Sequence, residues 1–137
     1  MKHLILAALA APLLAACSTT TGYAVAPEGS AVALGHPVAV ADIALTPLSV
    51  IEDSRCPINA RCVWAGRIVV ETQVDGAGWR DVLPLTLGEP SDSHGYYFSL
   101  VSAEPGRMAG SGTDPLEPED YRFIFEGSAP ENYRAAP

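Results

Sequence analysis

Apolar or β-branched residues occupy every second position from Ile68 to Val74, and this period of two limits the fold more than any other feature of the chain. Successive side chains of a β-strand point to opposite faces, so the alternation predicts a strand with one buried face. That face would carry Ile68, Val70, Thr72 and Val74. The turn residues DGAG follow at 75–78, and the next segment alternates at Leu83, Leu85 and Leu87. We therefore predict a β-hairpin over residues 67–87.

Further short strands are expected on both sides of this hairpin, because glycine or proline interrupts the chain about every ten residues. The candidates are 32–34, 38–41, 43–51, 96–101 and 121–125, the last with Tyr121, Phe123 and Phe125 on one face. Pro47 and Pro84 lack the amide hydrogen of a sheet ladder, so each should lie at an edge, a bulge or a strand end. About seven short strands in about 100 residues predict an all-β sandwich of two sheets, with a small β-barrel as the alternative.

The first 17 residues combine a positive charge at Lys2 with an almost wholly apolar run over residues 4–16. A permanent membrane span needs about 20 residues, so this run fits the hydrophobic region of a secretory signal instead. The run ends in LAAC at residues 14–17, and this ending resembles the lipobox of bacterial lipoproteins. An ordinary secretory signal that is cleaved elsewhere is the alternative.

The lipobox resemblance implies that the thiol of Cys17 carries a diacylglycerol and that the chain is cut just before this residue. Each buried CH₂ group contributes about 0.8 kcal/mol, so two or three acyl chains hold a protein firmly at a membrane. By the same resemblance, Ser18 permits sorting to the outer membrane. We therefore expect a lipid-anchored protein of the cell envelope, at the periplasmic leaflet of the outer membrane.

Four parts are expected along the chain: a signal peptide at 1–16, a lipidated flexible tether at 17–30, a β-domain at 31–126 and a loose tail at 127–137. The whole chain has eight basic and sixteen acidic residues, a formal charge of −8. Removing the signal peptide takes away the single lysine, Lys2, and leaves seven arginines and a formal charge of −9. Such a surface repels nucleic acid, so we expect no nucleic-acid partner.

Cys56 and Cys62 remain after lipidation of Cys17, and an even number of cysteines in an exported protein predicts a disulfide. Their spacing suits zinc poorly, because structural zinc sites use four ligands, usually in closely spaced pairs. His36 and His94 could complete such a site, but nothing in the sequence places them near the cysteines. A redox centre would favour C-x-x-C at a helix start. We therefore predict a structural disulfide, no metal site and no cofactor.

Four neighbours of the cysteines are interpreted as structural: Asp53, Arg55, Trp64 and Gly66. Counting back along the strand places Trp64 on the face of Val70, so we expect its indole in the core beside the disulfide. Gly66 would allow a bulge between them. Asp53 and Arg55 either brace the loop through a charge-assisted hydrogen bond or both face water.

The segment EDSRCPINARCVWAGRIVVE, at residues 52–71, resembles a segment of uncharacterised exported proteins and lipoproteins of bacteria. There D-S-R-C-P is followed by C-x-W-x-G and an apolar strand. The segments SLVSAEP at 99–105 and DYRFIFEG at 120–127 also look similar, so the resemblance extends over about residues 30–126. It supports the β-fold and the disulfide and implies no established activity.

The usual enzyme motifs are missing from the sequence: it has no G-x-S-x-G, no H-E-x-x-H and no Walker glycine loop. Asp92, Ser93 and His94 invite comparison with a catalytic triad, but adjacent residues point apart and a turn is expected. Residues 104–120 contain five acids. We expect this loop to be exposed and not catalytic. The alternative is that Glu119 and Asp120 act as calcium ligands or general acids.

The sequence therefore predicts a lipid-anchored envelope protein that acts as a binding or structural module and is not an enzyme. Its expected partners are the membrane, through the N-terminal lipid, and an envelope protein. A periplasmic protein that binds a small ligand or a metal ion is one alternative, and a hydrolase is the other.

Overall fold

The computed structural model describes residues 22–110 and 116–131, and the expected signal peptide and Cys17 lie outside these ranges. Its strands are β1 (Val38–Val40), β2 (Ile43–Asp53), β3 (Ile68–Gly76), β4 (Trp79–Thr86), β5 (Pro90–Ser93), β6 (Tyr96–Glu104) and β7 (Arg122–Ser128), with one short 3₁₀ helix at Pro118–Asp120. Within the described residues, no helix is long and apolar enough to cross a membrane.

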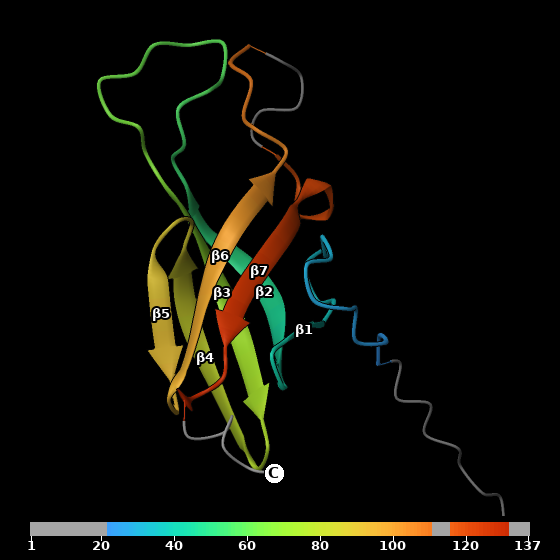
Figure 1. Cartoon of the computed structure of the whole chain (residues 1–137). Helices are drawn as coiled ribbons and strands as arrows, with labels where there is room; N and C mark the ends of the chain where they lie inside the picture. The colour runs from blue at the N-terminus through green and yellow to red at the C-terminus, as the bar shows by residue number, and fades with distance from the viewer. Residues whose placement is uncertain (1–21, 111–115, 132–137) are drawn as a thin grey trace, which may run out of the picture.

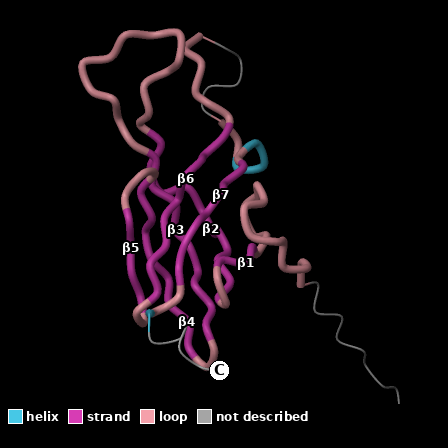
Figure 2. The backbone as a smooth tube through the Cα atoms, viewed as in Figure 1, coloured by secondary structure: helices cyan, strands magenta, loops and turns pink. Residues whose placement is uncertain are grey.

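Two antiparallel sheets face each other, as Figures 1 and 2 show. The four-stranded sheet has the order β1-β2-β3-β4, and the three-stranded sheet has the order β5-β6-β7. All named strand pairs are antiparallel, and the sheets do not close into a barrel. The predicted sandwich is therefore confirmed, and the barrel alternative is wrong.

The predicted hairpin forms between β3 and β4, with Gly76 opposite Trp79. The predicted buried face of β3 is confirmed, since Ile68, Val70, Thr72 and Val74 are all fully buried. These residues pack against the inner face of the other sheet, whose largest buried side chains are Phe98, Leu100, Phe123 and Phe125. Burial of each such side chain contributes about 1.5–3 kcal/mol, so this apolar layer is what holds the two sheets together.

The two strand prolines occupy the kind of position that their missing amide hydrogens require. Pro47 lies at a shift in the register between β2 and β3, which leaves Pro47 opposite Thr72 and Ser49 opposite Glu71. Pro84 lies in β4, which is an edge strand of its sheet. Both predictions are confirmed, because an edge or an irregularity is where a sheet tolerates a lost ladder bond.

Strand β5 was not predicted, because its sequence PSDS is short and polar. It pairs with β6 across a two-residue turn in which His94 has φ +51° and Gly95 has φ +82°. Positive φ at both central residues is typical of the hairpin turns that match the twist of antiparallel strands. The turn geometry and the neighbouring strand, and not any alternation of its own, therefore place β5 in the sheet.

The N-terminal segment runs along one side of the sandwich. Ala26 forms a parallel bridge to Val38, and Val32 forms an antiparallel bridge to Phe123 in β7. The expected strand at 32–34 is thus reduced to a single bridge. The described part of the expected tether, residues 22–30, is partly held against the domain, and at the other end Gly127 and Ser128 of the expected tail belong to β7.

Candidate functional site

Residues 54–67, which we call the clipped loop, leave the end of β2 and return to the start of β3. Figure 1 shows this loop projecting beyond the sheets at one end of the molecule, beside the segment that follows β6. Figure 2 shows that both segments are irregular, in contrast to the strands below them. A projecting loop without regular structure needs other interactions to keep one shape, and the clipped loop has three sets of them.

The first set is the disulfide between Cys56 and Cys62, whose Cα atoms are 5.8 Å apart. The predicted pairing is confirmed. The amide of Cys56 also donates a hydrogen bond of 2.9 Å to the carbonyl of Ala65, and the amide of Ser54 donates one of 2.8 Å to the carbonyl of Arg67. Together these bonds make a narrow neck at the base of the loop.

Gly66 is required by this neck and does not form the expected bulge. Its φ is +67°, a conformation that L side chains rarely adopt, and a Cβ atom there would lie 1.7 Å from the carbonyl oxygen of Ser54. The register irregularities of this sheet lie in β2 instead. Only glycine allows the two sides of the neck to approach so closely.

The second set is a charge pair at the end of β2. Arg55 donates through Nε to Oδ1 of Asp53 at 2.8 Å and through Nη2 to Oδ2 at 2.7 Å. The side chains of Arg55 and Asp53 are only 15% and 10% exposed. Of the two possibilities for this pair, the structure therefore has the brace and not two solvated side chains.

The brace also reaches the second sheet. Arg55 donates to the carbonyl oxygens of Ala103 at 2.7 Å and Pro105 at 3.1 Å, and the hydroxyl of Tyr121 donates to Oδ2 of Asp53 at 2.9 Å. A buried carboxylate with bidentate and hydroxyl donors has its charge well compensated. The clipped loop is therefore fixed to the ends of β2 and β6 and to the start of β7 at once.

Protonation in this network follows from burial and hydrogen bonding. Burial by itself would raise the pKa of Asp53, but the hydrogen bonds from Arg55 and Tyr121 outweigh it and hold that pKa below its usual value. Burial, aided by the hydrogen bond to Asp53, raises the pKa of Tyr121 to about 12. The carboxylate and the neutral phenol are therefore the stable forms at neutral pH.

The third set joins the clipped loop to residues 105–110. The amide of Ile58 donates to the carbonyl of Arg107 at 2.9 Å. Asn59 and Ala109 exchange two hydrogen bonds, of 3.0 Å and 2.8 Å. The guanidinium of Arg107 reaches the carbonyl oxygens of Asp53 and Arg55, each at 3.3 Å. Neither Arg107 nor Tyr121 was expected in this brace, because both are distant in sequence from the clipped loop.

The end of this loop is apolar and exposed. Ile58 is 74% exposed, Val63 92% and Trp64 81%, and we call these three residues the apolar tip. The expectation that Trp64 packs in the core is therefore wrong. The alternation of side chains between the two faces of β3 does not extend back to residue 64. Arg67 already lies outside the strand, and the positive φ at Gly66 turns the chain.

The charge of the clipped loop is opposite to that of the chain. It contains Arg55, Arg61 and Arg67 and no acidic residue, in a chain with sixteen acids. Arg55 pairs with Asp53, and Arg67 pairs with Glu52 at 2.9 Å. Among the described residues, Arg61 is exposed and no acidic side chain forms an ion pair with it. The apolar tip therefore has one positive charge beside it, that of Arg61, which forms no ion pair within the described residues.

The histidines and acids considered from the sequence lie elsewhere. His36 makes a hydrogen bond of 3.0 Å to the carbonyl of Leu34, and the ring of His94 stacks on Trp79. Ser93 donates to Asp81, not to Asp92, and lies at the start of the predicted turn. Within residues 22–110 and 116–131, no three metal-ligating side chains gather into a possible metal site.

The described acids of residues 104–120 are exposed, whereas Arg107 and Leu116 are half-buried. Glu104, Glu117, Glu119 and Asp120 all face solvent, the last three around the short 3₁₀ helix. Asp120 accepts a hydrogen bond of 3.0 Å from the amide of Glu117, which caps that helix. Glu119 and Asp120 are therefore part of the short 3₁₀ helix, and Asp120 helps to cap it.

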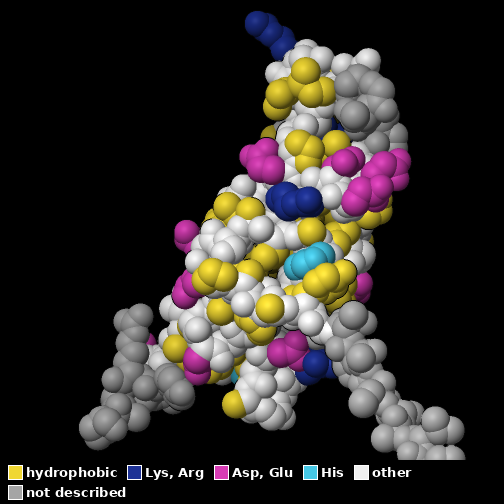
Figure 3. All heavy atoms as spheres, turned by 90° about the vertical axis from the view of Figure 1, so that its right-hand side faces the viewer, with side chains coloured by type: hydrophobic (Ala, Val, Ile, Leu, Met, Phe, Trp, Pro, Cys, Tyr) yellow, Lys and Arg dark blue, Asp and Glu magenta, His cyan; other side chains and the backbone are white. Residues whose placement is uncertain are grey.

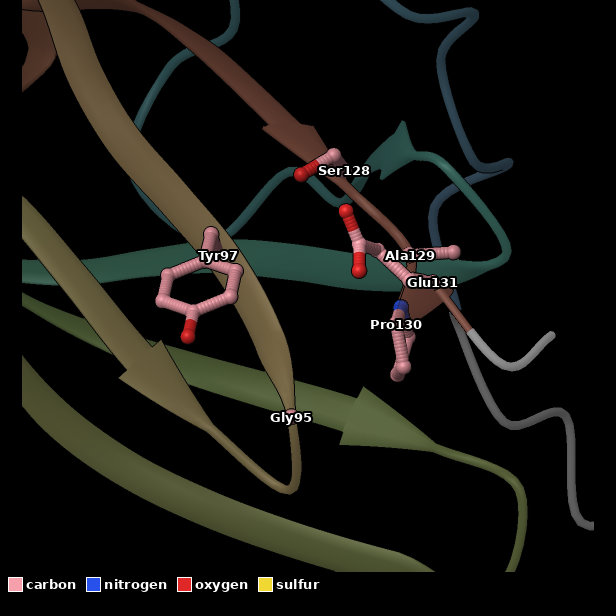
Figure 4. A pocket seen from close by; sticks show the side chains of 6 residues that line it. All are labelled: Gly95, Tyr97, Ser128, Ala129, Pro130 and Glu131. Carbon is pink, nitrogen blue, oxygen red and sulfur yellow. The ribbon is translucent and has the colours of Figure 1, made fainter. Parts of the chain in front are cut away.

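Two of the pockets on the described surface are candidate ligand sites. One, of about 550 Å³, lies at the end opposite the clipped loop and is lined by Gly95, Tyr97 and Ser128 to Glu131. In Figure 4 the hydroxyl of Tyr97 points away from the carboxylate of Glu131, so the two polar groups do not converge on a ligand. The other, of about 360 Å³, is lined mainly by Leu34, Leu48, Val50, Leu116, Pro118 and Tyr121, and we call it the side pocket.

No family model, curated protein or solved structure matches this chain. The clipped loop with its apolar tip is therefore identified as the candidate functional site from its geometry alone.

Proposed function

We propose that this protein is a lipid-anchored binding module of the bacterial cell envelope, which presents the apolar tip of the clipped loop to a protein partner. The exposure of Trp64 on a braced loop is the observation that carries the proposal. Tryptophan is enriched among the residues that dominate the energy of protein interfaces. A loop already held in one shape loses little conformational entropy when it binds.

The brace fits this role better than a purely structural one. A loop whose only task was to connect β2 and β3 would need neither a disulfide nor a tryptophan at its end. Here the buried hydrogen bonds of Asp53, Arg55 and Tyr121 lie at the base, while the large apolar side chains lie at the far end. Rigid support beneath an exposed anchor residue is what a recognition surface requires.

The lipid anchor is supported by the lipobox resemblance at residues 14–17, which assigns the lipid to Cys17. Anchoring would confine the domain to the surface of a membrane and raise its local concentration near other envelope proteins. The site of anchoring is expected to be the outer membrane, because Ser18 follows the lipidated cysteine in this reading.

The side pocket supports a second candidate function, the binding of a small apolar ligand. Its volume of about 360 Å³ falls within the range of about 300–1,000 Å³ that is typical of ligand pockets. Its lining is mostly aliphatic, so any ligand would be largely apolar. As for the hydrolase alternative, Ser93 and His94 both contact the carboxylate of Asp81, but the carboxylate and not the imidazole is in the middle, which differs from a Ser-His-Asp triad.

Co-purification tests the proposed function. Wild-type protein and a Trp64→Ala variant are crosslinked mildly in cells and purified from detergent-solubilised membranes. We expect a stoichiometric protein partner with the wild type and its loss with Trp64→Ala. Val82→Ala is the matched control, because Val82 is 48% exposed on the edge strand β4, away from the clipped loop. Equal recovery of the partner from both variants would reject the role of the tip.

A further inference from the structure

We propose that the partner of the apolar tip is a second copy of this chain, whose side pocket receives Trp64 and whose neighbouring carboxylates pair with Arg61. The inference rests on the proposed function and names the partner of the same site. It is carried by the complementarity of two surfaces that this one chain presents, the tip and the side pocket.

The tip is a small, mixed surface that is unusual on this domain. Val63 and Trp64 are among the most exposed large apolar side chains, and Arg61 between the two cysteines is exposed as well. Figure 3 shows hydrophobic side chains at this end of the molecule, with a basic one beyond them. A partner surface that fits this tip needs an apolar hollow with acidic groups beside it.

The side pocket has both properties. Leu34, Leu48 and Val50 form part of an aliphatic hollow of about 360 Å³, which is large enough to hold an indole ring. The 3₁₀ helix beside it carries the exposed carboxylates of Glu117, Glu119 and Asp120. Pro118 belongs both to this helix and to the pocket wall, so the acids border the hollow directly.

The acids that border the side pocket can still accept a cation, although the carboxylates of Glu117 and Asp120 each also accept a backbone hydrogen bond in the cap of the helix. Among the described residues, Glu117, Glu119 and Asp120 form no ion pair with an arginine side chain. Figure 3 shows acidic side chains gathered beside hydrophobic ones on the upper half of this face. A cation next to an indole thus meets carboxylates that form no ion pair and lie next to an apolar pocket, which gives complementarity in both charge and hydrophobicity.

The contact must be between two molecules. The clipped loop is tied to Ala103, Pro105 and Asp53 by the brace, so the tip cannot fold back onto the side pocket of its own chain. The tip lies at one end of the molecule and the 3₁₀ helix lies on its side (Figure 1). Because the two surfaces differ, each copy can bind one neighbour by its tip and another by its pocket.

A contact between two different surfaces generates chains of copies unless the rotation closes a ring. The copies share an excess of acidic residues, and this opposes their approach. Such repulsion is largely screened beyond about 8 Å at physiological ionic strength, whereas the pairing of Arg61 acts at contact distance. The contact area is small, so the association depends on the high local concentration that the proposed lipid anchor provides.

Site-specific photocrosslinking tests the inference. The full-length chain is produced in bacteria with a photoreactive phenylalanine in place of Trp64, and the crosslinked products are identified by mass spectrometry. We expect a ladder of multimers of this chain, with crosslinks from position 64 to Leu48, Val50 or Leu116. The same probe at Leu48 should capture residues 58–64 of another copy. The probe at Val82 is the control and should give at least fivefold less multimer.

Charge reversal provides the second test. Arg61→Glu should lower the yield of multimer from position 64 at least fivefold, because it places like charges beside the pocket. Combining Arg61→Glu with Glu119→Arg should restore at least half of the yield. Both residues are exposed, so neither change should prevent folding. Failure of the second change to restore the multimer would overturn the proposed pairing.

The crosslinked partner separates this inference from the proposed function. Crosslinks from position 64 to a different envelope protein would overturn self-association and leave the binding module standing. Crosslinks to lipid alone, or none above the level of the Val82 probe, would reject both. Multimers whose crosslinks fall outside the side pocket would reject the assigned surface.

Discussion

The hydroxyl of Tyr121 donates a hydrogen bond of 2.9 Å to Oδ2 of Asp53, and this bond links the start of β7 in one sheet to the end of β2 in the other. Arg55 holds the same carboxylate from the other side. The three residues form the base on which the clipped loop stands. Their arrangement explains how a loop with an exposed tryptophan can keep one shape in a small domain.

Replacing Tyr121 by phenylalanine removes one donor from the largely buried carboxylate of Asp53 and leaves the aromatic packing intact. We expect the free energy of unfolding to fall by about 1.5–3 kcal/mol, as is typical for a hydrogen bond to a charged group. Denaturant unfolding measures the change. Tyr97→Phe is the control, because Tyr97 is 62% exposed, and it should alter stability by less than about 0.5 kcal/mol. Equal stabilities of the two variants would contradict the role of the bond.

The free energy of unfolding should depend on pH through the titration of Tyr121 and Asp53. The pKa of Tyr121 is raised to about 12 in the folded state, so its contribution is complete below the ordinary value of about 10 and is lost as the pH rises toward 12. The pKa of Asp53 is lowered, so its contribution is present above the ordinary carboxyl range and is lost as the pH falls below it.

Thermal unfolding of the wild type and of Tyr121→Phe across pH 9–12 checks the alkaline side. The wild type should lose stability over this range and the variant should lose less. In acid, Asp53→Asn should show a flatter fall in stability than the wild type. Parallel curves for wild type and variants in both ranges would show that neither group is linked to folding.

Gly66→Ala should disrupt the neck of the clipped loop, because the new Cβ would lie 1.7 Å from the carbonyl oxygen of Ser54. Gly78→Ala is the matched control, since φ is +81° there and nothing lies within 4 Å of the added atom. The control should cost only the backbone penalty of about 1–2 kcal/mol. We expect Gly66→Ala to cost more and to expose the arginines of the loop to trypsin. Equal costs would show that the neck opens without strain elsewhere.

Removing the disulfide should destabilise the fold modestly. Closing a loop of this size contributes about 2.4 kcal/mol on the chain-entropy estimate, so the pair Cys56→Ser and Cys62→Ser should lower the free energy of unfolding by no more than about that amount. A non-reduced digest of the wild type should contain both residues in one crosslinked peptide. Two free thiols in the purified wild type would contradict the assigned bond.

Cys17→Ser should abolish the lipid anchor. We expect the wild type to incorporate a palmitate analogue and to fractionate with the outer membrane, and the variant to do neither. Lipid labelling that persists in the variant would contradict the assignment of Cys17. This outcome is independent of the clipped loop, since the β-domain does not include residue 17.

Local sequence determined most of the strands. The alternation at Ile68, Val70, Thr72 and Val74 specified a buried face, because a period of two can be satisfied only by an extended chain with one side in a core. Pro47 and Pro84 marked irregular and edge positions for an equally local reason, the missing amide hydrogen. The spacing of Cys56 and Cys62 limited the bond to a short clip.

Only the tertiary structure decided where Trp64 and β5 lie. In the sequence, Trp64 fits the period of two that continues into β3. In the structure, the positive φ at Gly66 breaks that period, and Trp64 is exposed to solvent. The polar strand β5 forms because its backbone pairs with that of β6 in an antiparallel ladder. Likewise, the sequence alone did not decide whether the side chain of Asp53 is buried or faces water. Its burial depends on Arg55, Tyr121 and the carbonyl of Ala103, which come from separate segments that only the packing of two sheets brings together.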